Sequence, residues 1–145
     1  MTYALGILDR LFVVYWRGQP DTAALDTILA EVQTRYTDLD TKLLYVTVIP
    51  RYLDAPDGFG RAALSRFGER ATPFVESTHI ILEGDGFRAS IQRSVVTAMY
   101  FFRRNVSRVH IYSSIEEARG MLAVLSGLEP GLIGRAIEAC GTLQV

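Results

Sequence analysis

The chain has 145 residues, a formal net charge of −1 at neutral pH and 49% hydrophobic residues. This length suits one domain with a core of its own, and the composition is that of an ordinary soluble globular protein. The nearly balanced charge argues against a nucleic-acid-binding protein, because that class usually has a basic surplus.

Three further features indicate a cytoplasmic protein. Cys140 is the only cysteine, so no internal disulfide can form, which suits a reducing compartment. Residues 1–16 lack the basic start of a secretion signal, and Asp9-Arg10 interrupts their apolar stretch. The longest apolar run, Leu43–Ile49, is too short to span a bilayer. We therefore expect a cytoplasmic chain without a membrane span.

The N-terminal part of the chain predicts a hairpin followed by a helix. Two apolar, β-prone runs, Tyr3–Leu8 and Leu11–Trp16, are separated by Asp9-Arg10, which has the length of a two-residue hairpin turn. Asp21 or Thr22 next caps a helix by accepting a backbone hydrogen bond. This helix has an apolar stripe with helical spacing, formed by Leu25, Ile28, Leu29, Val32 and Tyr36.

The middle of the chain continues the alternation of strand and helix. Lys42–Ile49 has no clean polar face, so we expect a central strand that is covered on both sides. The segment 51–60 predicts a loop, because it contains Pro56, Asp57, Gly58 and Gly60. A helix from about Phe59 to Arg70 follows, and Thr72-Pro73 ends it.

A β-α-β unit over Thr78–Tyr112 organises the second half of the chain. Thr78–Glu83 has the short apolar run of a buried strand, Gly84-Asp85-Gly86 predicts a tight turn, and Val109–Tyr112 predicts the next strand. Between them, the spacing predicts a helix over Phe87–Arg104. Its inward face is formed by Phe87, Ile91, Val95, Ala98, Met99 and Phe102.

The C-terminal segment predicts two helices. Ser114 and Glu117 have the spacing of a capping box, in which Ser114 caps the first helix and Glu117 bonds back to the N–H of Ser114. The inward side of this helix is formed by Ile115, Ala118, Leu122 and Leu125. After a break at residues 127–131, a short amphipathic helix has Leu132, Ile133, Ala136, Ile137 and Cys140 on one side.

Together these elements predict a single α/β domain over residues 1–127 and a C-terminal tail over residues 128–145. Strands that alternate with helices favour a mixed, mostly parallel sheet that helices cover, here with five strands.

This order of elements resembles the STAS or SpoIIAA-like domains, the fold of bacterial anti-sigma-factor antagonists. The resemblance covers about Tyr3–Leu125. It rests on the N-terminal hairpin, the strand, turn and helix over His79–Arg104, and the ending Val109–Ala118. It implies a regulatory, signalling module that binds a protein partner through the turn Gly84-Asp85-Gly86-Phe87 and the helix that follows.

The turn itself departs from the pattern of the resembled group. Signalling members have an Asp-Ser-Ser-Gly-like turn in which a partner kinase phosphorylates a serine, whereas Gly84–Phe87 contains no hydroxyl. The nearest serine, Ser90, is expected one turn into the helix. The resemblance therefore implies partner binding without the usual phosphoacceptor serine.

Two groups of residues suggest ligand chemistry, and each also has a simpler role. Gly84-Asp85-Gly86 precedes a helix N-terminus, where backbone N–H groups bind anions. Glu83 and Asp85 would repel a phosphate, however, so a tight turn is the simpler interpretation. If their strands are neighbours, His79 and His110 approach each other, and Glu83 or Glu76 becomes a third metal ligand. The simpler role of both histidines is that of ordinary sheet residues.

Cys140 is the remaining candidate for covalent chemistry. It lies on the apolar stripe of the tail helix with no histidine near it in sequence, so we expect packing and not nucleophilic catalysis. The sequence also lacks a Gly-x-Ser-x-Gly elbow and an isolated carboxylate pair. We accordingly predict no catalytic residue, no metal and no cofactor.

The aromatic run Tyr100-Phe101-Phe102 indicates a contact surface. Since a helix turns about 100° per residue, three consecutive rings cannot all face one core. Tyr100 and Phe101 then lie outside the inward stripe, near Arg93 and Arg104. Aromatic residues beside arginines are typical of the centre of an interface. The alternative is that the C-terminal helix covers both rings.

We therefore predict a non-enzymatic regulatory or adaptor module that binds a protein partner or associates with itself as a homodimer. The first alternative is a protein that binds a small apolar, lipid-like ligand, because related folds in the wider group hold lipophilic molecules between sheet and helices. The second alternative is an enzyme of unknown type.

Overall fold

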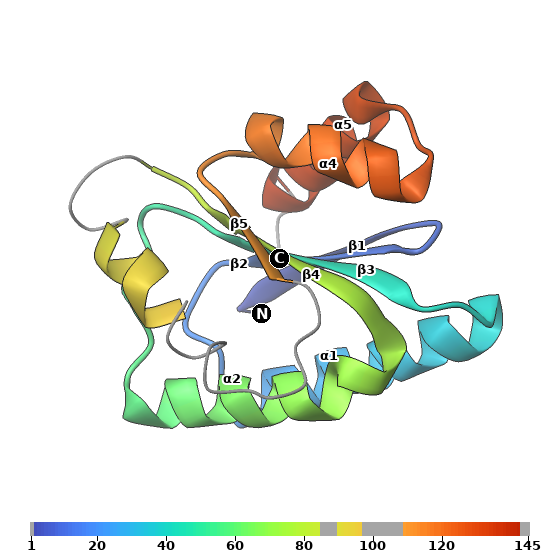
Figure 1. The fold of residues 1–145 in the computed structure, drawn as a ribbon. Coiled ribbons are helices and arrows are strands. Elements are labelled where there is room, and N and C mark those ends of the chain that lie inside the picture. Colours follow the sequence, from blue (N-terminus) through green and yellow to red (C-terminus); the bar gives the residue numbers. More distant parts are fainter. Residues whose placement is uncertain (1, 85–89, 97–108, 143–145) are drawn as a thin grey trace.

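The structure is a computed structural model, and it describes residues 2–84, 90–96 and 109–142 (Figure 1). These residues form a five-stranded sheet with the order β1-β2-β3-β4-β5. The strands are β1 (Tyr3–Leu8), β2 (Leu11–Trp16), β3 (Leu43–Ile49), β4 (Val75–Leu82) and β5 (Val109–Tyr112). Strands β1 and β2 are antiparallel, and the other three pairs of neighbours are parallel. The predicted α/β fold with a mixed sheet is confirmed.

Helices cover both faces of the sheet. Helices α1 (Thr22–Leu39) and α2 (Gly58–Ala71) cover one face, and α4 (Ile115–Ser126) and α5 (Pro130–Thr142) cover the other (Figure 1). Since βαβ crossovers are almost always right-handed, a sequential strand order places the connecting helices on one face. A short 3-10 helix, Thr72–Phe74, leads from α2 into β4. Within the described ranges, no helix combines the length and apolar character that crossing a membrane requires.

Local sequence signals explain where the elements begin and end. Asp9, in the hairpin turn, has a positive φ of 54°, a conformation that two-residue hairpin turns require. Asp21 caps α1 by accepting from the N–H of Ala24 at 2.7 Å. In the predicted capping box, Ser114 accepts from the N–H of Glu117, but the Glu117 carboxylate accepts from the N–H of Ser113 and not from that of Ser114. The prediction was therefore one residue off at this contact.

The core has two layers, one on each face of the sheet. Alternate residues of β3 point to opposite faces: Leu43 and Tyr45 pack under α1 and α2, whereas Leu44, Val46 and Val48 pack under α4 and α5. These five side chains are all buried. The prediction that this strand is central and covered on both sides is confirmed.

Helix α5 packs directly on the sheet. Ile133, Ile137 and Cys140 are buried against the layer that contains Leu11 and Val13. Leu132, which the sequence analysis placed on the same side, is 37% exposed. The inward stripe of α5 is therefore narrower than predicted.

The helical segment 90–96 is rotated relative to the prediction. Ile91 was expected to face the core, but it is 45% exposed, whereas Gln92 and Val96 are 5% exposed. Val96 packs against Ile80 and Leu82 of β4. Gln92 is buried because its side-chain amide donates to the carbonyl oxygen of Leu53, a tertiary contact that apolar spacing does not reveal.

Candidate functional site

The turn after β4 is described only at its first residue. Gly84 has a φ of +105°, where a glycine is favoured, and a Cβ there would lie 3.1 Å from the Cβ of Arg51. The other predicted contact residues of the turn and helix, Asp85, Gly86, Phe87, Tyr100, Phe101 and Arg104, lie outside the described residues. The partner surface predicted from them stays a prediction.

Two further predicted contact residues, Ser90 and Arg93, are described. Ser90 is exposed, at the beginning of the segment 90–96. Arg93 is half-buried and donates a hydrogen bond to the hydroxyl of Ser113, at the junction between β5 and α4. Its Nε is buried and has no hydrogen-bond partner among the described residues. The guanidinium group of Arg93 is therefore already engaged in a hydrogen bond within the fold.

The two histidines do lie side by side, as expected if their strands were neighbours. His79 pairs with His110 across β4 and β5, and the rings stack with centroids 4.9 Å apart and planes 6° apart. Their proposed third ligands are engaged elsewhere: Glu76 pairs with Arg10 at 3.1 Å, and Glu83 accepts from the hydroxyl of Tyr15 at 3.0 Å. The described residues contain no group of three or more side chains that is arranged to hold a metal ion.

His79 lies in the middle of a short, buried chain of two hydrogen bonds. Its Nε2 lies 2.8 Å from the hydroxyl oxygen of Ser77, and its Nδ1 lies 3.0 Å from that of Tyr112. His79 and Ser77 are 0% and 2% exposed. Burial and, to a smaller extent, the charge of His110 lower the pKa of His79 to about 4, so its ring is neutral at physiological pH.

A serine next to a histidine is also the arrangement of an activated nucleophile. Here, however, both ring nitrogens of His79 are occupied and neither side chain reaches solvent. The chain Ser77–His79–Tyr112 therefore satisfies polar groups inside the sheet layer. Cys140 is likewise buried, with its thiol near the carbonyl oxygen of Ala136, and burial raises its pKa.

A pocket of about 60 Å³ opens at the carboxyl ends of β2, β3 and β4. Trp16, Thr47, Ile49 and Ile80 form its wall on the sheet, and the rest of its lining comes from Gln19, Pro20, Leu53, Asp54, Pro56, Leu64 and Val96. We call this the carboxyl-edge pocket. The indole N–H of Trp16 donates to the hydroxyl of Thr47 at 2.9 Å. Because these two polar groups satisfy each other, the wall presents an apolar surface.

Two side-chain amides hold the loop over this pocket. Gln19, which precedes α1, donates to the carbonyl oxygen of Asp54 at 2.9 Å, and Gln92 donates to that of Leu53 from the opposite side. The loop also contains an internal hydrogen bond from the N–H of Leu53 to the carbonyl oxygen of Pro50 at 3.1 Å. The cover of the pocket is therefore bound to elements on two sides.

The sequence alone did not predict this pocket, although one of its loops lies beside it. Ligands of open α/β sheets bind outside the carboxyl ends of strands, at the point where the strand order reverses. The predicted loop at 51–60 begins at a carboxyl end, but the described strands follow one another in order, without such a reversal. What the sequence did not reveal is that residues from the hairpin, α2 and the segment 90–96 meet there. No protein-family model, no curated protein and no solved structure matches this chain significantly.

Proposed function

We propose that this protein is a non-enzymatic binding module whose carboxyl-edge pocket holds a small apolar ligand. The observation that carries the proposal is the pocket itself, a concave apolar surface at the carboxyl ends of three strands. A polar ligand would find few groups to bond with there, because Trp16 and Thr47 already pair. A non-enzymatic role is supported by the Ser77–His79–Tyr112 chain, because it is buried and both ring nitrogens of His79 are bonded within it.

The proposal is tested by titrating the protein with toluene while the indole N–H signal of Trp16 is followed by NMR. Trp16 is the only tryptophan and lines the pocket, so its signal is an unambiguous reporter. We expect a saturable shift, together with a rise in melting temperature, because a ligand that binds only the folded state stabilises it. Absence of a saturable shift in the wild-type protein would refute the proposal.

A matched pair of variants checks where toluene binds. Val96→Phe enlarges a side chain that lines the pocket and should abolish the shift. Val95→Phe enlarges its half-buried neighbour, which does not line the pocket, and should leave the shift in place. Binding that survives in Val96→Phe and disappears in Val95→Phe would place the ligand elsewhere.

We propose protein-partner binding, the regulatory or adaptor role that the STAS-like resemblance implies, as the second candidate. It is favoured by exposed apolar side chains on elements that border the same pocket. Phe59, in the first turn of α2, is 90% exposed, and Ile91 is 45% exposed. Large apolar groups in water favour association, because burial of each stabilises a complex by on the order of 2 kcal/mol.

Self-association is the form of this candidate that can be tested with the chain alone. We expect Phe59→Ser to lower the weight-average mass in sedimentation equilibrium. Val124→Ser is the control, since Val124 is 80% exposed but lies on α4, on the opposite face of the sheet. A monomeric wild-type protein, or equal masses for all three proteins, would contradict self-association through Phe59.

A further inference from the structure

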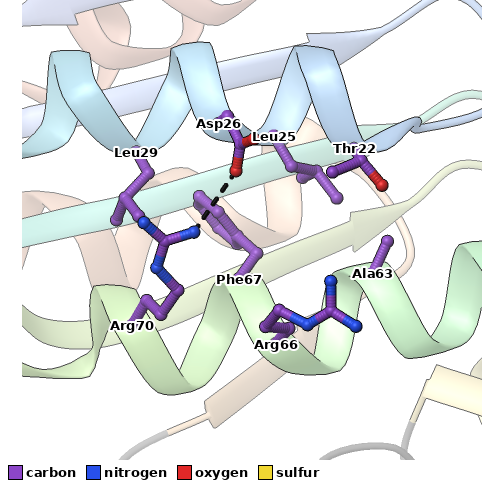
Figure 2. Close-up of a pocket in the computed structure, with 8 residues that line it drawn as sticks. All are labelled: Thr22, Leu25, Asp26, Leu29, Ala63, Arg66, Phe67 and Arg70. Atoms are coloured by element: carbon purple, nitrogen blue, oxygen red, sulfur yellow. Dashed lines mark hydrogen bonds and ion pairs between the residues drawn. The ribbon is translucent and has the colours of Figure 1, made fainter.

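A second pocket, with a volume of about 110 Å³, lies between α1 and α2 (Figure 2). Among the described residues, none lines both this pocket and the carboxyl-edge pocket, so what it binds is independent of the function proposed above. We call it the interhelical pocket. We propose that it binds a small carboxylate that carries a short apolar chain, such as a medium-chain fatty acid.

The floor of the interhelical pocket is apolar. Leu25 and Leu29 of α1 are each 3% exposed, and Phe67 of α2 is 8% exposed. All three belong to the core layer under these helices, so packing holds them in place. The volume above them suffices for several water-sized groups. A short hydrocarbon chain would occupy this space and thereby remove its own apolar surface from water.

The rim of the pocket is basic. Arg66 and Arg70 are four residues apart on α2 and therefore lie on the same side of the helix. Figure 2 shows Arg70 extending toward α1, where it is linked to Asp26, and Arg66 lying along α2 on the side of Ala63. Among the described residues of the lining, Asp26 is the only carboxylate beside two guanidinium groups. Arg66 makes no hydrogen bond or ion pair with the described residues.

The existing ion pair leaves Arg70 available to a ligand. Its Nη1 lies 3.3 Å from Asp26, and the two side chains are 55% and 59% exposed. Exposed pairs of this kind contribute about 0–1 kcal/mol, because water screens them. A ligand carboxylate can form stronger, paired hydrogen bonds with the fork of a guanidinium group. Arg66 and Arg70 thus place two guanidinium groups at the rim of an apolar floor.

These features select the class of ligand. An inorganic anion would bond with the rim but leave the space above the apolar floor unfilled, and a neutral hydrocarbon would fill that space but offer no anion to Arg66. A fatty acid combines an anionic group for the rim and an apolar chain for the floor in one molecule. Its carboxylate would bind a guanidinium group at the rim, and its chain would lie on Leu25, Leu29 and Phe67.

The test is calorimetric titration with three probes: octanoate, 1-octanol and acetate. We expect octanoate to bind at least about tenfold more tightly than either of the other two, since each lacks one of the two contacts. Equal affinity for octanoate and octanol would overturn the role of the arginines. Equal affinity for octanoate and acetate would overturn the role of the apolar floor.

Three variants make the test specific. Arg66→Gln should weaken octanoate binding at least about tenfold, whereas Arg61→Gln, an exposed arginine of the same helix outside the pocket, should bind as the wild type does. Asp26→Asn should tighten binding, because it removes the competing carboxylate and frees Arg70. All three positions are exposed, so the variants should stay folded, which circular dichroism can check. Weaker binding in Asp26→Asn, or unchanged binding in Arg66→Gln, would refute the proposal.

Discussion

At the scale of single residues, His79 is the least ordinary position in the sheet. It is a titratable group with 0% exposure, and its ring accepts and donates only within the fold. Its pKa is lowered from 6.5 to about 4, chiefly by burial and secondarily by the charge of His110. The unfolded chain therefore takes up a proton at His79 at a higher pH than the folded chain does.

This difference predicts a stability that depends on pH. The contribution of neutral His79 should be fully present above pH 6.5 and lost as the pH falls toward 4, because protonation then favours the unfolded state. The full effect corresponds to roughly 3 kcal/mol. Urea unfolding at several pH values between 7 and 5 should show the decline in the wild-type protein and a much smaller one in His79→Gln.

His110→Gln is the control for this prediction. It removes the smaller cause of the shift but leaves His79 buried, so most of the pH dependence should remain. The opposite result, a flat profile in His110→Gln and an unchanged decline in His79→Gln, would assign the titration to His110 and contradict the prediction.

At the scale of elements, α5 and the N-terminal hairpin touch at two glycines. A Cβ on Gly6 of β1 would overlap the Sγ atom of Cys140, and a Cβ on Gly141 of α5 would lie 2.9 Å from the ring of Tyr15. Neither glycine has a positive φ. Both are therefore needed for close approach of α5 to the hairpin and not for an unusual backbone conformation.

We predict that Gly6→Ala destabilises the protein by about 1–3 kcal/mol, because the added methyl group overpacks the contact with Cys140. The double variant Gly6→Ala with Cys140→Ala should recover at least about 0.5 kcal/mol relative to additivity, as coupled neighbours do. Denaturant unfolding of both single variants and the double variant measures this coupling.

The exposed Gly120 is the matched control for this pair. It lies inside α4, and no atom from another described element lies within 4 Å of the place that an added methyl group would take, so Gly120→Ala should stabilise the helix by about 0.5–1 kcal/mol. If Gly6→Ala and Cys140→Ala were simply additive, the glycine would have no packing role toward that side chain.

Some elements could be predicted from the sequence, and others could not. The hairpin, the central strand β3 and the cap at Ser114 follow from signals within a few residues, so they were predictable. The rotation of segment 90–96 was not, because Gln92 is buried by a bond to Leu53, which is 39 residues away in sequence. The apolar spacing instead favoured Ile91, which is exposed.

The two pockets were beyond sequence reasoning for the same reason. Each is lined by residues from separate elements, and local sequence patterns do not indicate which helices become neighbours. The spacing of Arg66 and Arg70 put them on one side of α2, but only the packing of α1 against α2 brings Asp26 and Leu29 to that side. The adjacency of His79 and His110 was predictable once β4 and β5 were assumed to pair.

At the scale of the whole molecule, the hairpin joins both C-terminal helices to the sheet. Arg10, at its turn, donates to the carbonyl oxygen of Leu125 near the end of α4, and Arg17, just after β2, donates to that of Cys140 near the end of α5. Cations near helix C-termini are favourable, since unpaired carbonyl groups gather there. The first and last parts of the chain are therefore mutually dependent.

This dependence predicts the effect of removing α5. In a chain that ends at Leu128, the layer that includes Ala4, Leu11 and Val13 loses its contacts with Ile133 and Ile137, which are both 0% exposed. Each fully buried isoleucine contributes about 1.5–3 kcal/mol, so the loss is comparable with the total stability of a small domain. We expect the shortened chain to lose cooperative thermal unfolding and its near-ultraviolet circular dichroism. A chain that ends at Thr142 retains all of α5 and should unfold as the full chain does. A cooperative transition at the wild-type temperature in the chain that ends at Leu128 would instead make α5 an appendage to a self-sufficient domain.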